Sequence, residues 1–466
     1  MRLTTLLALG LSFLVSGITQ AADTVNQLAP QYYGQNSHST LPTVPKNIVV
    51  MIGDGMGPAY TTAYRYYKDN PETQEIEQTV FDRLLVGMSS TNPAPSSGFI
   101  TDSAASATAL ATGYKTYNGA ISVDEQKQPL PTLFELAKQR GMATGIAVTS
   151  QVNHATPAAF LVHNESRKNY VDIAEDYLQT DADVILGGGQ QYFSAKLLEK
   201  FIAKGYQHIS EFRQLADVTQ PKVLGLFAPV QMPWAIDKPN AHQLRTMTQK
   251  SLELLSQHQQ GFVLLVEGSL IDWAGHSNDI ASAMHEMDEF AASIEVVEQY
   301  VRTHKDTLLV VTADHNTGGL SVGANGEYAW NPAFLQHVSA SPWLLAKQAF
   351  NNEQWQQPLQ SALQVKLTDT QWQQLTQARS QDETTLVTAI IDVINQHSNT
   401  GWTGLGHTAS DVQVFATGPG ANLFIGHQDN TDIANNLISL LPKSPAEIPL
   451  KKLADTPKEP ELSTVK

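Results

Sequence analysis

Three segments of the chain are almost continuously apolar and rich in β-branched residues, and an acidic residue follows each of them. Such runs are typical of strands in a parallel sheet, because these strands are buried on both faces. The acidic residues are Asp54 after residues 47–53, Glu267 after residues 262–266, and Asp314 after residues 307–313. Ligands of open α/β sheets bind at the carboxyl ends of the strands. We therefore expect these carboxylates to meet at one edge of a sheet, with Asp272, His276 and His315 close by.

Several carboxylates gathered at one edge predict bound cations. Like charges at short range raise one another's pKa, so the acids cannot all stay ionised unless positive ions lie among them. The sequence contains no cysteine, so any metal would be held by Asp, Glu, His and hydroxyl side chains rather than by thiolates. The pattern therefore predicts a site for more than one metal ion.

Weaker patterns between these runs indicate the same type of fold. Residues 144–148 and 183–186 predict two further strands, and residues 280–300 predict a long helix that leads into the third acid-tipped strand. Strands that alternate with helices are typical of an α/β fold with a parallel sheet.

The composition changes from about residue 325 to residue 400, which is rich in Gln and Trp and separates segments that carry candidate ligands. Thr368 and Gln371 suit a helix capping box. Leu386, Ile390 and Val393 fall on one face of a helix, together with Ile394 and His397. We interpret this stretch as a mixed helical insertion that serves as an interface or a lid.

These patterns divide the chain into four parts. They are a signal peptide at residues 1–21, a catalytic domain made of residues 40–324 and 401–441, an inserted helical or mixed subdomain at residues 325–400, and a weakly ordered C-terminal tail at residues 442–466.

The first 21 residues have the features of a secretory signal. Arg2 gives a positive start, residues 6–15 are apolar, and small residues precede a cleavage point after Ala21. The apolar run is too short to span a bilayer. We expect a periplasmic or secreted protein that is not held by a membrane after cleavage.

The formal net charge of −16 argues against nucleic acid as a binding partner. It also means that an anionic substrate would need a strongly positive site.

A second informative segment predicts the start of a helix near residue 102. Asp102 suits the N-cap and Gly113 suits the C-terminal stop. Ser103 would then lie beside free backbone N–H groups and the positive end of the helix, which favours an alkoxide. An Asp-Ser pair at a helix start is usually an ordinary cap. Only the metal-ligand segments make Ser103 a candidate nucleophile.

Taken together, the motifs resemble those of bacterial alkaline phosphatases. The matching segments, in the order of that family, are residues 54–57, 101–108, 112–120, 267–272 with His276, 312–315 and 406–408. The resemblance implies an α/β fold with three α/β/α layers, a large and mostly parallel central sheet and an inserted subdomain. It also implies a homodimer that hydrolyses small-molecule phosphate monoesters.

The resemblance further implies two zinc ions and one magnesium ion. The ligands would be Asp272, His276 and His407 for the first zinc; Asp54, Asp314 and His315 for the second, which Ser103 completes; and Asp54, Thr156 and Glu267 for magnesium. This division suits the metals, because imidazole and carboxylate ligands favour zinc and an all-oxygen set favours magnesium.

Arg167 matches the arginine with which the family binds phosphate, and its planar guanidinium can bind two phosphoryl oxygens at once. The implied mechanism has two displacements. Ser103 attacks phosphorus and forms a phosphoserine, and water then hydrolyses it. The metal ions and Arg167 outweigh the carboxylates, so the formal charge of the site would be positive despite the acidic chain.

Two positions depart from some well-known members, which have Asp and Lys where this chain has His154 and Trp273. The pair resembles a marine, cold-active branch of the family. Losing a lysine beside the phosphate predicts weaker product binding. His154 has two interpretations, a residue near magnesium or a neighbouring histidine whose hydrogen bonds are already satisfied.

Two alternatives to a phosphomonoesterase remain open. One is a phosphodiesterase or sulfatase-type hydrolase on a related scaffold, but such enzymes use a Thr or a modified Cys, unlike Ser103. The other is a non-catalytic metal- or phosphate-binding protein, which the full set of nucleophile, ligands and Arg167 disfavours.

Overall fold

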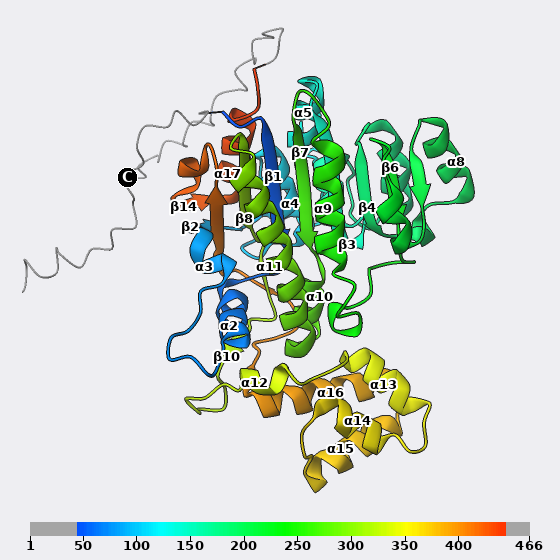
Figure 1. Cartoon of the computed structure of the whole chain (residues 1–466), viewed down its shortest axis with the longest axis vertical. Helices are drawn as coiled ribbons and strands as arrows, with labels where there is room; N and C mark the ends of the chain where they lie inside the picture. Colours follow the sequence, from blue (N-terminus) through cyan, green and yellow to red (C-terminus); the bar gives the residue numbers. More distant parts are fainter. Residues whose placement is uncertain (1–43, 444–466) are drawn as a thin grey trace, which may run out of the picture. The chain divides into compact units, whose positions relative to one another are not determined.

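A ten-stranded sheet forms the centre of the computed structural model, which describes residues 44–443 (Figure 1). The strand order is β14 (Gly426–Asp429), β2 (Leu85–Ser90), β13 (Val412–Thr417), β8 (Thr307–Thr312), β1 (Asn47–Gly53), β7 (Phe262–Gly268), β3 (Ala143–Gln151), β4 (Val184–Gly188), β6 (Val223–Leu226) and β5 (Gln207–Ile209). The predicted signal peptide and nearly all of the predicted tail lie outside the described residues.

Most neighbouring strands of this sheet are parallel. Among the described strands of the sheet, only β13 runs antiparallel to both of its neighbours, β2 and β8. At the centre, β1 pairs in parallel with β7 and β8, and Ile52 lies opposite both Glu267 and Thr312. This register puts the ends of the three acid-tipped runs at one level, as the sequence predicts.

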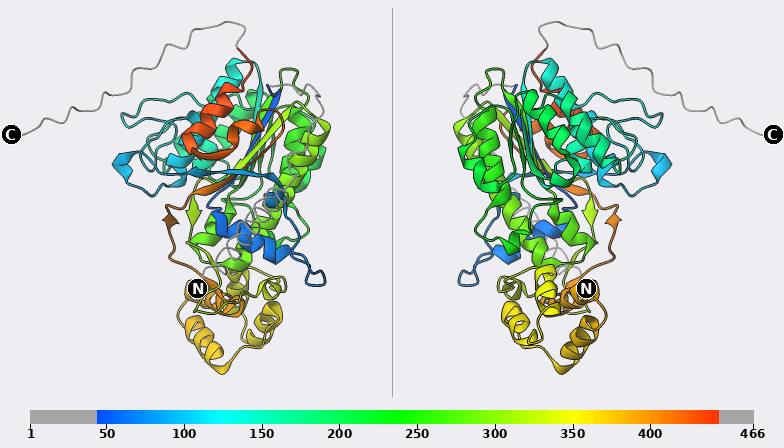
Figure 2. Two further views of the ribbon diagram at one scale, coloured as in Figure 1. Left: turned by 90° about the vertical axis from the view of Figure 1, so that its left-hand side faces the viewer. Right: turned by 90° about the vertical axis from the view of Figure 1, so that its right-hand side faces the viewer.

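Helices cover both faces of the sheet, which gives three layers (Figure 2). Alternate residues of β1 enter two separate hydrophobic clusters, with Val49 and Met51 in one and Ile48, Val50 and Ile52 in the other. The first cluster packs against α2 (Pro58–Lys68), α3 (Val80–Leu84), α9 (Gln243–Leu255) and α11 (Ile280–Thr303). The second packs against α4 (Ser103–Thr112), α5 (Leu133–Gln139), α6 (Ala155–Leu161), α7 (Tyr170–Asp176), α8 (Ala195–Ala203) and α17 (Asn430–Ser439). The predicted fold class is confirmed.

Short elements complete the edge of the sheet that carries the acids. They are α10 (Leu270–His276) and two small antiparallel ladders, β9 (Asn316–Thr317) with β12 (His407–Thr408) and β10 (Ser321–Val322) with β11 (Thr400–Gly401). The first ladder brings His407 back to the segment that follows β8, across a long stretch of sequence.

Residues 325–400 contain α12 (Pro332–Leu335), α13 (Pro342–Phe350), α14 (Gln356–Leu363), α15 (Asp369–Arg379) and α16 (Glu383–Ser398). The predicted capping box of Thr368 and Gln371 begins α15. The apolar face of α16 is buried, and this helix packs against α11 while α12 packs against α2. The division into a catalytic domain and an inserted subdomain stays a prediction.

None of the helices between residues 44 and 443 is both long and apolar enough to cross a bilayer.

Candidate active site

The three strand-end acids meet in the interior at the carboxyl edge of the sheet. Asp54, Glu267 and Asp314 are all fully buried. Both carboxylate oxygens of Asp54 and of Glu267, and one oxygen of Asp314, accept no hydrogen bond within the described residues. Buried carboxylates are normally paired or bound to metal, because an unpaired buried charge is strongly unfavourable.

The pKa values of these acids reflect their burial and their mutual repulsion. Burial, followed by the nearby Asp314, Asp272 and Glu267, raises the pKa of Asp54 well above its ordinary value. Burial and then Asp314 raise the pKa of Glu267 to about 8. Divalent cations would reverse both effects by favouring the charged forms. The acids therefore fit a site built for metal ions.

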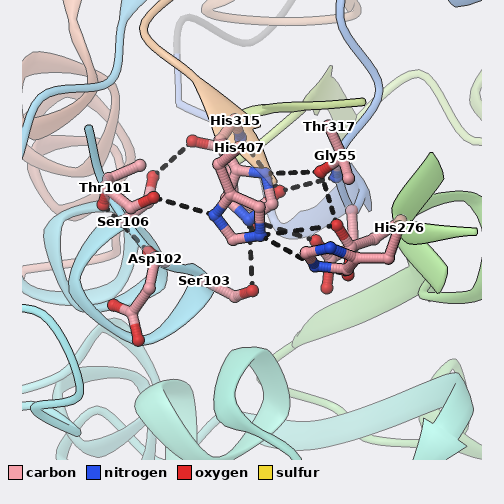
Figure 3. A network of polar contacts seen from close by, with 12 residues as sticks. Gly55, Thr101, Asp102, Ser103, Ser106, His276, His315, Thr317 and His407 are labelled. Carbon is pink, nitrogen blue, oxygen red and sulfur yellow. Dashed lines mark hydrogen bonds and ion pairs between the residues drawn. The ribbon is translucent and has the colours of Figure 1, made fainter. Parts of the chain in front are cut away.

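The first group of candidate ligands surrounds His315 (Figure 3). Its Nε2 lies 3.4 Å from Oδ1 of Asp54, 3.3 Å from Oδ2 of Asp314 and 3.1 Å from Oγ of Ser103. Burial lowers the pKa of His315 well below its usual value. The imidazole is therefore neutral, which is the form that binds metals. The predicted second-zinc ligands and Ser103 thus converge on one point.

The second group contains Asp272, His276 and His407. Nε2 of His276 lies 3.3 Å from Oδ2 of Asp272, and Nε2 of His407 lies 3.6 Å from Oδ1 of Asp272. The two Nε2 atoms are 3.1 Å apart, and Figure 3 shows His276 and His407 side by side. These three side chains offer ligand atoms within 4.8 Å of one another.

Backbone carbonyls fix the protonation of this second group. Nδ1 of His276 lies 2.6 Å from the carbonyl oxygen of Leu405, and Nδ1 of His407 lies 2.8 Å from that of Thr101. A carbonyl oxygen only accepts, so both Nδ1 atoms donate and each Nε2 is left free to act as a ligand, with the two Nε2 atoms facing each other. A cation between them removes the repulsion of their lone pairs. Metal-binding histidines usually donate their other ring N–H to a carbonyl or a carboxylate in this way.

The third group lies deeper. Ligand atoms of Asp54, Glu267 and His154 come within 4.8 Å of one another. The hydroxyl of Thr156 is buried and forms no hydrogen bond within the described chain. Asp54 belongs to both this group and the group around His315. Its position between the two agrees with the bridging role that the resemblance implies.

Asp102 positions both Ser103 and Arg167. Oδ1 of Asp102 accepts from the backbone N–H of Ala105, which caps α4, and Oδ2 accepts from Nη1 of Arg167 at 3.0 Å. The N–H of Arg167 donates to the carbonyl of Gly119. One carboxylate therefore holds the candidate nucleophile and the candidate phosphate ligand in a fixed relation.

His154 lies against Arg167. Its Nε2 is 3.2 Å from Nη2 of Arg167, which can only donate, so this ring nitrogen accepts. Burial, followed by the charge of Arg167, lowers the pKa of His154 to about 3, and the ring stays neutral. Its Nδ1 is buried without a hydrogen bond. The ring of Trp273 packs edge-on against it, with 5.9 Å between the centroids.

The structure brings all twelve sequence-predicted residues to this edge of the sheet, and it adds three features that the sequence analysis missed. The Oγ1 of Thr317 donates to Asp272 and lies beside Nδ1 of His315. Ser106 donates to the carbonyl of Asp314. Asp272 offers ligand atoms within 4.8 Å of those of Asp54 and His315 as well as of those of His276 and His407. The sequence could have indicated Thr317 through its position, because it lies only two residues after the candidate ligand His315.

Comparison with known proteins finds one family whose sequences match most of the chain. The alkaline phosphatase family model matches residues 45–442. Alkaline phosphatase 3 of Bacillus subtilis (strain 168) is 41% identical over 410 residues, which cover 85% of this chain and 89% of that protein.

Two solved structures extend the likeness to three dimensions. The cold-active alkaline phosphatase of the psychrophile Shewanella sp. is 65% identical, covers 85% of this chain and 100% of its own, and superposes with a TM-score of 0.84. A variant of the alkaline phosphatase from the Antarctic bacterium TAB5, solved with Mg bound in its M3 site, is 25% identical. It covers 85% of this chain and 98% of its own, with a TM-score of 0.64. The predicted resemblance to cold-active members is confirmed, and the chain belongs to the alkaline phosphatase family of enzymes.

Proposed function

We propose that the chain hydrolyses phosphate monoesters to an alcohol and inorganic phosphate, through a phosphoserine on Ser103, with two zinc ions and one magnesium ion. The observation that carries the proposal is the position of Ser103. Its Oγ lies at the first turn of α4, 3.1 Å from Nε2 of His315, close to buried carboxylate oxygens of Asp54 and Asp314 that accept no hydrogen bond within the described residues.

The residues that would hold the metals follow the three groups. Asp272, His276 and His407 would hold the first zinc; Asp54, Asp314 and His315 the second; and Asp54, Thr156 and Glu267 the magnesium. When bound, these ions would supply Lewis-acid stabilisation of the attacking, leaving and phosphoryl oxygens. The Mg bound by the TAB5 variant supports a magnesium position in this fold.

The protein's own groups account for the two steps. Oγ of Ser103, deprotonated at the positive end of α4, attacks phosphorus, and the ester bond breaks as the alcohol oxygen leaves with its electron pair. Water then attacks the phosphoserine and releases phosphate, which restores Ser103. Arg167, oriented by Asp102, binds two phosphoryl oxygens in both steps.

The test is hydrolysis of p-nitrophenyl phosphate. We expect Ser103→Ala and removal of metals by a chelator each to abolish the reaction. Ser194→Ala is the control, because Ser194 also lies at a helix start, where its hydroxyl accepts from the N–H of Leu197 in α8, but it belongs to none of the three groups. Full activity of Ser103→Ala would refute the serine mechanism. Faster hydrolysis of a phosphodiester or a sulfate ester would favour the alternative hydrolases.

We also propose that the protein is exported and forms a homodimer, on the strength of its family and its first 21 residues. Periplasmic fractionation and light scattering of the purified protein test the two statements separately.

A further inference from the structure

A cavity of about 520 Å³ opens beside the candidate active site. Small-molecule sites in proteins are clefts of comparable size with largely aromatic walls. The cavity is lined by Gln231, Trp234, Trp273, His276, Ser277 and Trp343. Its three tryptophans come from three separate segments: the residue before the short 3-10 helix η5 (Ala235–Asp237), α10, and α13 of the helical insertion. Figure 1 labels α10 and α13.

One wall of the cavity belongs to the candidate metal site. His276 lines the cavity, and its Nε2 lies 3.1 Å from Nε2 of His407. Trp273, on another wall, packs against His154, which in turn contacts Arg167. A phosphate bound by Arg167 would therefore have the cavity next to its ester oxygen on the side of His276.

Hydrogen bonds to two helices hold the segment that carries Trp234. Glu286 of α11 accepts from the backbone N–H of Ala235 at 2.8 Å, and Gln243 of α9 donates to the carbonyl of Pro233 at 3.0 Å. Both anchors lie on helices that pack on the central sheet. The backbone on each side of Trp234 is thus fixed before any ligand arrives, which lowers the entropy that binding would cost.

The same segment holds the start of α13. Asp237 accepts from the backbone N–H of Ser341 at 2.8 Å and from its hydroxyl at 2.7 Å. Ser341 caps α13, two residues before Trp343. The two tryptophans from distant parts of the chain are therefore tied together by one carboxylate. Trp343 remains partly exposed, with 37% of its surface accessible, so its ring can contact a ligand.

We propose, on the basis of the proposed phosphatase function, that this cavity binds the leaving group and favours phosphate monoesters whose alcohol carries a planar aromatic ring next to the ester oxygen. Tryptophan rings bind such groups by offset stacking or edge-to-face contact. The lining contains no acid and no lysine or arginine, so it offers no carboxylate, ammonium or guanidinium group to attract a charged leaving group.

Benzyl phosphate and ethyl phosphate provide the test, because both release primary alcohols and differ mainly in the ring. We expect the unmodified protein to favour benzyl phosphate in kcat/KM by about tenfold, and Trp234→Ala or Trp343→Ala to lower this preference about threefold or more. Trp343→Phe keeps an aromatic face and should retain most of it. Tyr328→Ala, which removes a fully exposed aromatic side chain of the same insertion outside the cavity lining, should leave the preference unchanged.

A binding measurement separates this inference from the proposed function. Benzylphosphonate and ethylphosphonate are not hydrolysed, and we expect the unmodified protein to bind the benzyl compound about tenfold more tightly. Equal affinities, or tryptophan variants that weaken both compounds equally, would overturn the aromatic subsite even if hydrolysis proceeds. If neither ester is hydrolysed but the two phosphonates still differ in affinity, the proposed function is refuted and the aromatic subsite is supported. If an alanine variant does not fold, Trp343→Phe and the two phosphonates still decide.

Discussion

The two halves of the candidate metal site differ in how they are built. Asp54, Glu267, Asp314 and His315 are fully buried and follow directly from the central strands. His276 and His407 come from α10 and the short strand β12, and the side chain of His276 is 42% exposed. The buried half has little room to rearrange, whereas the exposed half borders the cavity. We infer from this difference that the buried half positions the nucleophile and that the exposed half contacts the leaving group.

The largest effect is expected from the buried half. Asp54→Ala should remove magnesium and the second zinc together and lower kcat by about four orders of magnitude, because Asp54 belongs to two of the ligand groups and is proposed to hold both ions. Elemental analysis and a steady-state assay measure both. Retention of both metals in this variant would contradict the bridging role of Asp54.

Removing one ligand of the exposed half should cost less. We expect His276→Ala to weaken one zinc and lower kcat about 100-fold, with the other two metals retained. Asp272 and His407 remain and can still hold an ion with water. Titration of zinc back into the metal-free variant checks the effect. Equal losses in His276→Ala and Asp54→Ala would remove the distinction between the halves.

The role of Arg167 in phosphate binding can be tested with a substitution that conserves its charge. Arg167→Lys keeps one positive charge but loses the two-point contact and the bond geometry to Asp102. We expect kcat/KM to fall by about 30-fold and the inhibition constant of phosphate to rise, with metal content unchanged. Loss of metal in this variant would show that Arg167 acts on the metal site rather than on the phosphate.

The smallest expected effect concerns a buried acid outside the metal site. Burial raises the pKa of Glu286 from 4.5 to about 8. The folded state therefore binds this proton more tightly than the unfolded chain, and its stabilising effect declines as the pH rises from 4.5 to about 8. We expect unfolding measurements on metal-loaded protein to show a loss on the order of 2 kcal/mol between about pH 6 and pH 8, absent in Glu286→Gln. The same pH slope in both proteins would rule out Glu286 as its source.

Much of the buried half could be predicted from the sequence. Continuous apolar runs predict central parallel strands, and the carboxyl ends of such strands lie at the same edge of the sheet. Asp54, Glu267 and Asp314 could therefore be predicted to lie close together. The cap at Asp102 and the stop at Gly113 were also predicted correctly, because both depend on neighbouring residues alone.

The remaining geometry depends on contacts that no local pattern encodes. The antiparallel position of β13 between β2 and β8 arises from long-range pairing. The place of Asp272 between two groups of ligands depends on how the short helix α10 packs. Trp234 and Trp343 line one cavity, and their segments are joined by hydrogen bonds from Ser341 to Asp237, more than one hundred positions away. Residue types along the chain give no signal for these encounters.

The proposed function is tested most directly by locating the phosphoryl group during turnover. The protein is mixed with a phosphate monoester at mildly acidic pH, quenched in acid, digested and analysed by mass spectrometry. We expect a phosphate on Ser103 in the peptide from the start of α4, and none in the Ser103→Ala protein. Turnover without phosphate on Ser103, or with phosphate on another residue, would contradict it.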